Sequence, residues 1–311
     1  LDAVGQLTIA ADGTITTELL TAEDLSGLTP DPEVKALEDA WISEINAQLG
    51  QVIGYAEVTL DNYDTEGNRL VRYTHMSSGN YNTSTAKQYG DISFLTSNPE
   101  IGEDVGELFN ALTGYFGPRM YNHLLVAPLT LKSSLIQKIE REIEVHKVSG
   151  NGYIAMKANG LIDSDIIASL YKASNAGVRV DLNIRGLCCL RPGIPGVSEN
   201  IRVTSIVDRF LEHSRIYYFE NGGNPEMYMG SSDMMPRNLL ARVEVLFPVL
   251  DREMMVNIRD SILRIHLQDN VKARELLPDG TYRLVQRKTG EKKLRSQKWF
   301  IDHRGVWHGS E

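Results

Sequence analysis

A single stretch, residues 152–186, constrains the fold more than any other part of this sequence. Its letters are GYIAMKANGLIDSDIIASLYKASNAGVRVDLNIRG. The pattern predicts a short apolar strand up to Asn159, a helix opened by Asp163 and closed by Gly177, and a second strand that ends at Arg185. A strand, a helix and a strand in this order form a crossover, so the two strands should be parallel. We therefore predict an α/β fold whose sheet is parallel at least in part.

The ends of these two strands indicate where a ligand should lie. Ligands of open α/β sheets bind beyond the carboxyl ends of the strands, and Asn159 and Arg185 fall at those ends. A loop rich in glycine and proline follows Arg185 and carries Arg191. A guanidinium in such a loop can hold a phosphate with two hydrogen bonds. Loop arginines are more often solvated charges, so the prediction depends on whether several of them meet.

The segment RFLEHSRIYYFE, residues 209–220, contains the pattern His-x-Arg-x4-Glu. We predict a short helix that ends at Leu211, followed by a strand. Residues two apart on a strand point to the same face, so His213 and Arg215 should lie together, whereas Glu220 has the opposite phase. An imidazole beside a guanidinium can exchange a proton with a phosphoryl group or be phosphorylated itself. The alternative is a structural histidine on the polar rim of a strand.

Two turns of small residues suggest a duplication. Ser78 is followed thirteen residues later by Asp91, and Ser231 is followed thirteen residues later by Glu244. Each acidic residue lies in a stretch with the pattern of a strand. Turns with serine and glycine are common, so the repeat alone is weak. It nevertheless predicts two similar halves that face each other.

Charge divides the chain unevenly. Residues 1–50 hold ten of the 41 acidic residues but only one of the 32 basic ones, Lys35. The remainder is balanced, so these first residues form a different kind of segment. A chain of 311 residues is also long enough for two or three compact units. We divide it into an acidic segment (residues 1–50), a partial domain (51–123) and a complete domain (124–311).

Cysteine usage and hydropathy indicate the cellular compartment. Cys188 and Cys189 are adjacent, where a disulfide would be strained, so we expect reduced thiols in a cytoplasmic protein. No apolar run approaches the roughly 18 residues of a membrane span, and the first residues lack the basic start of a secretory signal. No metal-ligand spacing occurs around the cysteines, and we assign no metal-binding residue.

Longer stretches carry a family resemblance. Residues 173–219 and 230–249 resemble the last domain of bacterial polyphosphate kinases, which move the terminal phosphate of ATP onto polyphosphate. Residues 72–115 resemble the end of the preceding domain. The two domains of that family resemble phospholipase D, and the resemblance extends from about residue 70 to residue 311. It implies a phospholipase D-like mixed sheet with flanking helices, a partial second copy and an unrelated N-terminal segment.

The same resemblance implies the roles of three residues. Tyr89 would pack on the nucleotide, Arg185 would bind its phosphates, and His213 would be the second histidine of the transfer site. It also implies ATP and Mg²⁺ as cofactors and inorganic polyphosphate as a partner. We expect neither a nucleic acid partner nor a membrane span, and we leave open whether the chain forms a homo-oligomer.

The chain departs from the family where the chemistry begins. The phosphorylated histidine of the family lies in a Lys-x-His-x-Lys strand, which falls here on VIGYAEVTL, residues 52–60, a stretch with neither histidine nor lysine. Met234 stands where the family has tryptophan, and Leu240 where it has aspartate. Residues 1–60 resemble, weakly, the connecting region of the 5'-nucleotidase family and lack its catalytic motif. We therefore predict a polyphosphate kinase C-terminal portion that binds ATP and polyphosphate but shows little or no turnover alone.

Two other functions compete with this one. A non-catalytic polyanion-binding or assembly module could use the basic strip RKTGEKKLRSQK, residues 287–298, although such a strip is more often a solvated hairpin. A phospholipase-like hydrolase is disfavoured, because Arg215 replaces the lysine expected after the histidine and the first half-site is missing.

Overall fold

The computed structural model describes residues 58–63, 70–113 and 120–303. The chain divides into two compact units, each described here by itself. The larger contains residues 77–93 together with everything from Leu124 onward, and the smaller contains the preceding residues and residues 94–123. The acidic segment, residues 1–50, lies outside the described residues, as do most of the residues that resemble the 5'-nucleotidase family.

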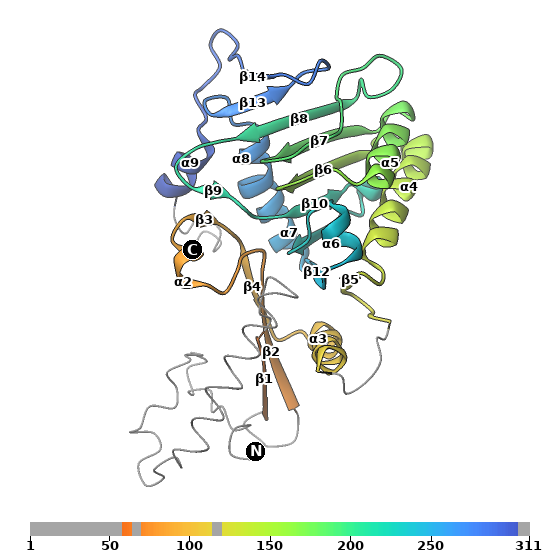
Figure 1. Cartoon of the computed structure of the whole chain (residues 1–311), viewed down its shortest axis with the longest axis vertical. Coiled ribbons are helices and arrows are strands. Elements are labelled where there is room, and N and C mark those ends of the chain that lie inside the picture. Colours follow the sequence, from red (N-terminus) through yellow and green to blue (C-terminus); the bar gives the residue numbers. More distant parts are fainter. Residues whose placement is uncertain (1–57, 64–69, 114–119, 304–311) are drawn as a thin grey trace. The chain divides into compact units, whose positions relative to one another are not determined.

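A nine-stranded sheet forms the centre of the larger unit (Figure 1). Its strand order is β14-β13-β8-β7-β6-β10-β11-β12-β5. The strands β6, β7 and β8 are parallel, and the other pairs are antiparallel. The strands are β5 (Leu125–Ala127), β6 (Tyr153–Ala158), β7 (Arg179–Ile184), β8 (Ile201–Ile206), β10 (Ile216–Phe219), β11 (Glu226–Gly230), β12 (Glu244–Pro248), β13 (Ala273–Leu276) and β14 (Tyr282–Leu284). The prediction of a mixed α/β sheet with flanking helices is confirmed.

Helices and one small extra sheet complete this unit. A two-stranded parallel sheet joins β3 (Tyr89–Gly90) to β9 (Leu211–Glu212). The helical segments are α2 (Thr83–Ala86), α4 (Leu131–Ser149), α5 (Ser164–Asn175), η1 (Asn221–Gly223), α6 (Pro236–Leu240), α7 (Arg252–Ile258), the π-helical turn η2 (Arg259–Leu263), α8 (Arg264–Leu267) and α9 (Ser296–Asp302). Residues 252–267 thus form three consecutive helical segments, α7, η2 and α8.

The predicted crossover is present, and its boundaries have clear physical causes. The Asp163 carboxylate caps α5 by accepting the main-chain N–H groups of Asp165 and Ile166, each at 3.1 Å. Gly177 follows the helix with φ = 95°, a conformation that glycine adopts without strain. The flanking strands β6 and β7 are parallel, in the register Ile154 to Val180.

The two faces of the central strands have different covers. Side chains alternate along a strand, and Ile154 and Met156 of β6 join the hydrophobic core beneath α4 and α5. Ala155 points to the other face, where η2 and α8 pack. Lys157 has the same phase as Ala155 and is only 1% exposed. A lysine is therefore buried on the α8 face of the sheet.

The prediction of a helix that ends at Leu211 is wrong. The chain bends at residues 208–210 and then forms the short strand β9. The Arg295 guanidinium binds the Asp208 carboxylate at 2.7 and 2.6 Å. The Gln297 side chain accepts from the main-chain N–H of Phe210 at 2.9 Å and donates to its carbonyl at 2.8 Å. These contacts satisfy backbone groups that a helical turn would otherwise pair.

The smaller unit contains a hairpin. Strands β1 (Val58–Tyr63) and β2 (Leu70–Ser77) are antiparallel, and β2 also pairs with β4 (Ser93–Thr96). Helix α3 (Pro99–Leu112) begins after Asn98, whose side chain accepts from two main-chain N–H groups of its first turn. In the described part of the chain, no helix has the length and apolar character that a bilayer span requires.

The packing of α5 on the sheet generates a prediction. Leu170 of α5 is fully buried, so Leu170→Ala should lower the free energy of unfolding by about 2–5 kcal/mol through lost apolar contact and a residual cavity. Denaturant titration of the whole chain measures the loss. Val148→Ala, at a position 90% exposed, is the control and should change little. Equal effects of the two substitutions would contradict this packing.

Candidate functional site

His213 lies between β9 and β10, and its main chain is held on both sides. Its N–H donates to the Gly90 carbonyl at 3.2 Å, and its carbonyl accepts from the Asn159 side-chain amide at 3.0 Å. The neighbouring Ser214 N–H also donates to the Gly90 carbonyl, at 3.0 Å. The pairing of β3 with β9 brings residues 89–91 to this position.

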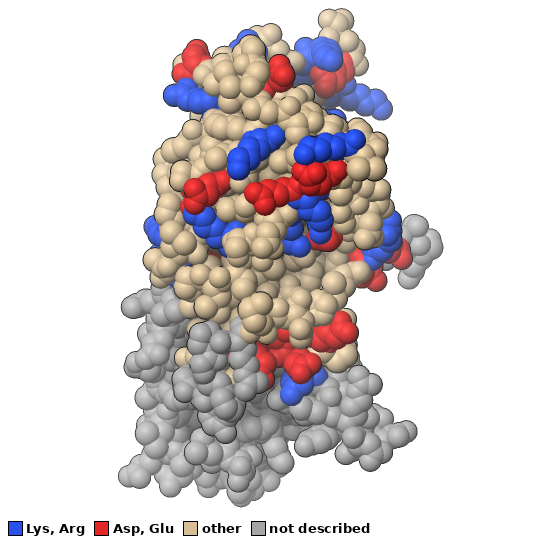
Figure 2. Space-filling view, turned by 90° about the vertical axis from the view of Figure 1, so that its right-hand side faces the viewer, with Lys and Arg blue, Asp and Glu red and all other residues tan. Residues whose placement is uncertain are grey.

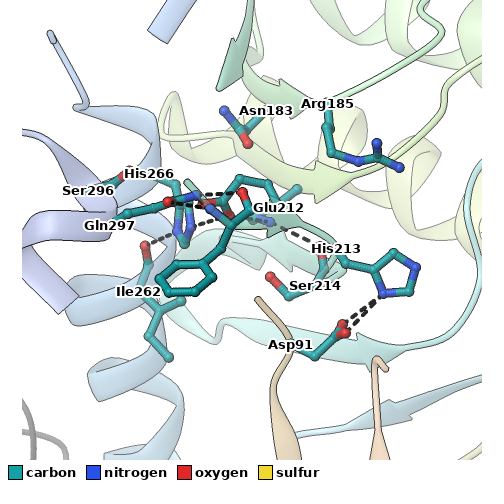
Figure 3. Close-up of polar contacts among 12 residues, drawn as sticks. Asp91, Asn183, Arg185, Glu212, His213, Ser214, Ile262, His266, Ser296 and Gln297 are labelled. Atoms are coloured by element: carbon teal, nitrogen blue, oxygen red, sulfur yellow. Dashed lines mark hydrogen bonds and ion pairs between the residues drawn. The ribbon is translucent and has the colours of Figure 1, made fainter. Parts of the chain in front are cut away.

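An acidic partner fixes the ring of His213. Nδ1 lies 3.0 Å from both carboxylate oxygens of Asp91 (Figure 3). The Ser78 hydroxyl donates to Asp91 at 2.8 Å, and Gly79 provides the room, because a Cβ there would lie 2.5 Å from the Asp91 carboxylate. A carboxylate only accepts, so Nδ1 carries a proton and the neutral ring keeps its lone pair on Nε2. That nitrogen can take a proton from a reacting group.

Arg215 and Asp233 form a buried ion pair beside this histidine. Nε and Nη2 of Arg215 bind the two oxygens of Asp233 at 3.2 and 2.9 Å. Nη1 donates to the Ser78 carbonyl at 2.9 Å and lies 3.2 Å from both ring nitrogens of His213. The prediction that His213 and Arg215 lie together is thus met. Glu220 does not join them and instead accepts from the Tyr218 hydroxyl.

These surroundings set the protonation of His213. Burial lowers its pKa below the ordinary value, the hydrogen bond to Asp91 opposes this shift, and the Arg215 charge reinforces it. For Asp233, burial would raise the pKa, but the Arg215 guanidinium more than compensates and the pKa is lowered. The site therefore combines a neutral imidazole with an ionised buried pair near neutral pH.

Arg185 meets His213 through one amide. Nε of Arg185 donates to Asn159 Oδ1 at 2.7 Å, and the other end of that amide binds the His213 carbonyl. In Figure 3 the side chains of Arg185 and His213 both extend toward the right of the view. Within the described ranges, no acceptor takes the two terminal nitrogens of Arg185. Asn159 thus ties the Arg185 guanidinium to the main chain of His213 at the carboxyl end of the parallel strands, and two of the guanidinium's nitrogens remain for a ligand.

A cavity of about 650 Å³ opens beside Arg185. Its wall consists of Lys87 and Gln88, Arg185 and the segment 206–212. Lys87, Arg185 and Arg209 give this wall three cationic side chains. Its two acidic residues have partners outside the wall, because Asp208 is bound by Arg295 and Glu212 by Lys157 and His266. The cavity has the size of a small-molecule site and an excess of positive charge.

Tyr89 and Arg191, two other residues singled out in the sequence, lie in different places. The Tyr89 ring packs on the His213 ring, with centroids 4.6 Å apart and the planes inclined by 47°. Arg191 is exposed and lies against Gly280, in the turn between β13 and β14, where its charge helps to lower the pKa of Asp279. Arg191 therefore does not join the site.

The suspected repeat has a structural counterpart. The Ile92 N–H donates to the Ser78 hydroxyl at 3.0 Å, and the Val245 N–H donates to the Ser231 hydroxyl at 2.9 Å. In both halves a serine thus binds the residue that follows the acid. Asp91 faces His213, but Oε2 of Glu244 has no hydrogen-bond partner among the described residues. The strand expected to carry the other histidine, residues 52–60, lies largely outside those residues.

Glu244 is buried without an ion-pair partner among the described residues, and this burial changes its pKa. The side chain is 2% exposed, and burial raises its pKa to about 7, although hydrogen bonds from Ser231 and Asn238 partly oppose the shift. Asn238 donates to Oε1 at 2.5 Å. The two acids of the repeat thus occupy similar positions with different electrostatic surroundings.

Sequence reasoning missed several buried residues of the site. Asp233, Lys157, Glu212 and His266 carried no motif by which they could be recognised, and only the folded chain brings them together. No group of three or more histidine, cysteine, aspartate or glutamate residues that could hold a metal occurs within residues 58–63, 70–113 and 120–303. The described residues therefore do not fit a Mg²⁺ site.

Charged surfaces elsewhere give little support to a general polyanion-binding module. On the face covered by α4 and α5, basic and acidic side chains intermingle (Figure 2). In the basic strip, Arg295 is bound to Asp208 and Lys298 to Asp302. The other four cations of the strip are exposed: Arg287, Lys288, Lys292 and Lys293.

Comparisons with known proteins agree on one family. The model for "Polyphosphate kinase C-terminal domain 2" matches residues 124–297, and that for "Polyphosphate kinase C-terminal domain 1" matches residues 56–118. A polyphosphate kinase of Prosthecochloris aestuarii is 58% identical over 220 residues, which are 71% of this chain and 31% of that protein. Polyphosphate kinase 1 of Chlorobaculum tepidum is 52% identical over 270 residues, or 87% and 38% of the two chains.

A solved structure gives the same answer for the fold. The crystal structure of polyphosphate kinase from Porphyromonas gingivalis superimposes with a TM-score of 0.75 at 39% identity, over 83% of this chain and 40% of that one. The chain thus spans roughly a third of the length of the relatives named here.

The ring of His213 generates one prediction. Asp91→Asn removes the negative charge that favours the imidazolium, so the pKa of His213 should fall further below its ordinary value. Histidine NMR titration measures it, with His213→Gln assigning the signal. Asp279→Asn, in an exposed turn, should leave the titration unchanged. An unchanged or raised pKa in Asp91→Asn would refute the pairing.

The buried Glu244 side chain generates a second prediction, on how stability depends on pH. Its folded-state pKa of about 7 exceeds the ordinary 4.5, so its stabilising contribution is complete below pH 4.5 and is lost as pH rises through 7. The loss amounts to ~3 kcal/mol at most. Glu244→Gln should therefore flatten the fall in unfolding free energy between pH 5 and 8, as measured by denaturant titration. The control Glu253→Gln, at an exposed carboxylate, should keep the parent's slope.

Proposed function

This chain belongs to the polyphosphate kinase family, and we propose that its larger unit binds ATP and inorganic polyphosphate at the site around His213 and Arg185. The observation that carries the proposal is the Asn159 amide, which binds both the Arg185 side chain and the main-chain carbonyl of His213. The family model that covers residues 124–297 describes the C-terminal domain of such enzymes. The proposal includes a boundary between a partial domain, residues 51–123, and a complete domain, residues 124–311. It also includes a cytoplasmic location, with which the two free thiols are compatible.

The phosphates would lie along the cationic wall of the cavity. The terminal nitrogens of Arg185 can bind phosphate oxygens in the two-point geometry that guanidinium groups favour. Lys87 and Arg209 line the same cavity and add positive charge for a longer chain of phosphates. Tyr89, which packs on His213, offers a ring edge on which a nucleotide base could rest.

His213 would then move a proton during transfer. With Nδ1–H directed at Asp91, Nε2 of the neutral ring can accept a proton from an attacking group or, once protonated, return it to the departing oxygen. The lowered pKa keeps this nitrogen free near neutral pH, and the Asp91 carboxylate stabilises the imidazolium that forms. Phosphoryl transfer itself needs mostly positioning and charge, which Arg185 and its neighbours would supply.

Turnover by this chain alone should be small. The sequence where the family carries its phosphorylated histidine, residues 52–60, contains no histidine. The chain also spans only 31% and 38% of two enzymes of the family. We therefore propose binding without sustained transfer. The described residues offer Mg²⁺ no cluster of ligands, so no step of the proposal depends on a metal ion held by them.

Arginine substitution tests the proposal. Arg185→Ala should weaken ATP binding roughly tenfold or more, because charged hydrogen bonds to phosphate are lost. The matched control is Arg191→Ala, at a loop arginine six residues away that lies against Gly280. Isothermal titration with ATP and with polyphosphate measures both. If Arg185→Ala changes nothing while binding falls steeply with salt, the proposal fails and the exposed basic strip becomes the better explanation.

A further inference from the structure

Two adjacent residues of the site point in opposite directions. His213 projects toward Asp91, whereas the side chain of Glu212 projects the other way, toward His266 and Gln297 (Figure 3). Glu212 belongs to β9 and is 5% exposed. The proposed proton transfer by His213 does not involve the Glu212 carboxylate. Burying a carboxylate costs free energy, so the burial of Glu212 must have another explanation.

Three elements converge on this carboxylate. Lys157 of β6 lies 3.1 Å from Oε2, and Nε2 of His266 in α8 lies 2.8 Å from the same oxygen. Gln297 of α9 donates to Oε1 at 2.7 Å. Burial alone would raise the pKa of Glu212, but His266 and Lys157 together reverse the shift and lower it. Glu212 is therefore a carboxylate that is fully bound on both oxygens.

His266 enters this cluster with both ring nitrogens in contact with oxygen atoms. Its Nδ1 lies 2.8 Å from the Ile262 carbonyl, and its Nε2 faces the Glu212 carboxylate. Both neighbouring atoms only accept hydrogen bonds, so N–H groups of the ring would satisfy them. His266 thus holds the Glu212 carboxylate from α8, opposite Lys157.

Lys157 binds both residues next to His213 in the sequence, Glu212 and Ser214. The same ammonium that binds Glu212 also donates to the Ser214 carbonyl at 3.3 Å. The residues before and after the histidine are thus held from the α8 face of the sheet by one buried cation. Asn159, the residue directly after β6, binds the carbonyl of His213 itself. Three consecutive residues are thus held by side chains from the end of β6.

A buried ionic cluster is an expensive way to gain stability, since apolar side chains of similar volume often do as well. What it provides is a unique placement of the atoms that it binds. We infer that Glu212 and Lys157, together with His266 and Gln297, are positioning residues that hold His213 in the orientation that faces Asp91. Only the expected effect on ligand affinity rests on the proposed function. The orientation of His213 can be measured without a ligand.

The decisive variant removes both charges at once. Lys157→Met with Glu212→Met removes both members of this ion pair, so the double variant should melt above either single variant, each of which leaves one member buried without the other. With the anchors gone, His213 gains access to water, and its lowered pKa should rise toward the ordinary value. The charged groups that face the ring, Asp91, Arg215 and Asp233, are unchanged. Affinity for ATP and polyphosphate should fall roughly tenfold.

A second variant covers the case in which the double variant does not fold. Gln297→Ala removes only an amide near the end of the described chain, one that binds Glu212 and the main chain of Phe210. It should raise the pKa of His213 in the same direction by a smaller amount. Histidine NMR titration, with His213→Gln for assignment, measures both variants.

The matched control is another buried carboxylate. Glu142 is fully buried and accepts from the main-chain N–H groups of Tyr153 and Asn221, at the opposite end of β6. Glu142→Gln should lower the melting temperature and leave the titration of His213 unchanged. If folded variants of the cluster titrate as the parent does, the positioning role is refuted. If the parent binds neither ATP nor polyphosphate, the proposed function fails while the titration still decides this inference.

Discussion

The guanidinium of Arg215 is the contact on which the geometry of the site depends. It is 5% exposed and binds Asp233, the Ser78 carbonyl and the region of both ring nitrogens of His213. A buried guanidinium without Asp233 would carry an uncompensated charge, and without the Ser78 carbonyl it would keep an unsatisfied N–H group. The glycine turn at residues 77–79, the turn at Asp233 and the histidine are therefore fixed jointly, although they lie far apart in the sequence.

This arrangement explains why two similar half-sites differ in charge. Both use a serine hydroxyl to bind the main chain after an acid, so their backbones correspond. Asp91 faces an imidazole beside a guanidinium, whereas Glu244 has an unpaired oxygen among the described residues and a pKa of about 7. The same acid position is thus an ionised partner in one half and a near-neutral group in the other.

The sequence predicted the parts of the fold that local patterns control. The crossover followed from periodicity, from the Asp163 cap and from Gly177, and the same pattern placed Asn159 and Arg185 directly after two parallel strands. The helix predicted up to Leu211 failed because Gln297, far along the chain, satisfies that backbone. Partners such as Lys157 and His266 could not be predicted, since a buried lysine in an apolar strand has no signature until its carboxylate is known. Resemblance supplied the roles of the site residues.

The two buried ion pairs are weak evidence for activity. Removing one member of Arg215–Asp233 or of Lys157–Glu212 leaves a buried charge without its partner, so folding alone retains these residues even in a chain that lacks the first histidine. Arg185, Lys87 and Arg209 are different, because they face a cavity and their loss would cost the fold little. It is therefore the cationic wall of the cavity, more than the buried cluster, that argues for a ligand rich in phosphate.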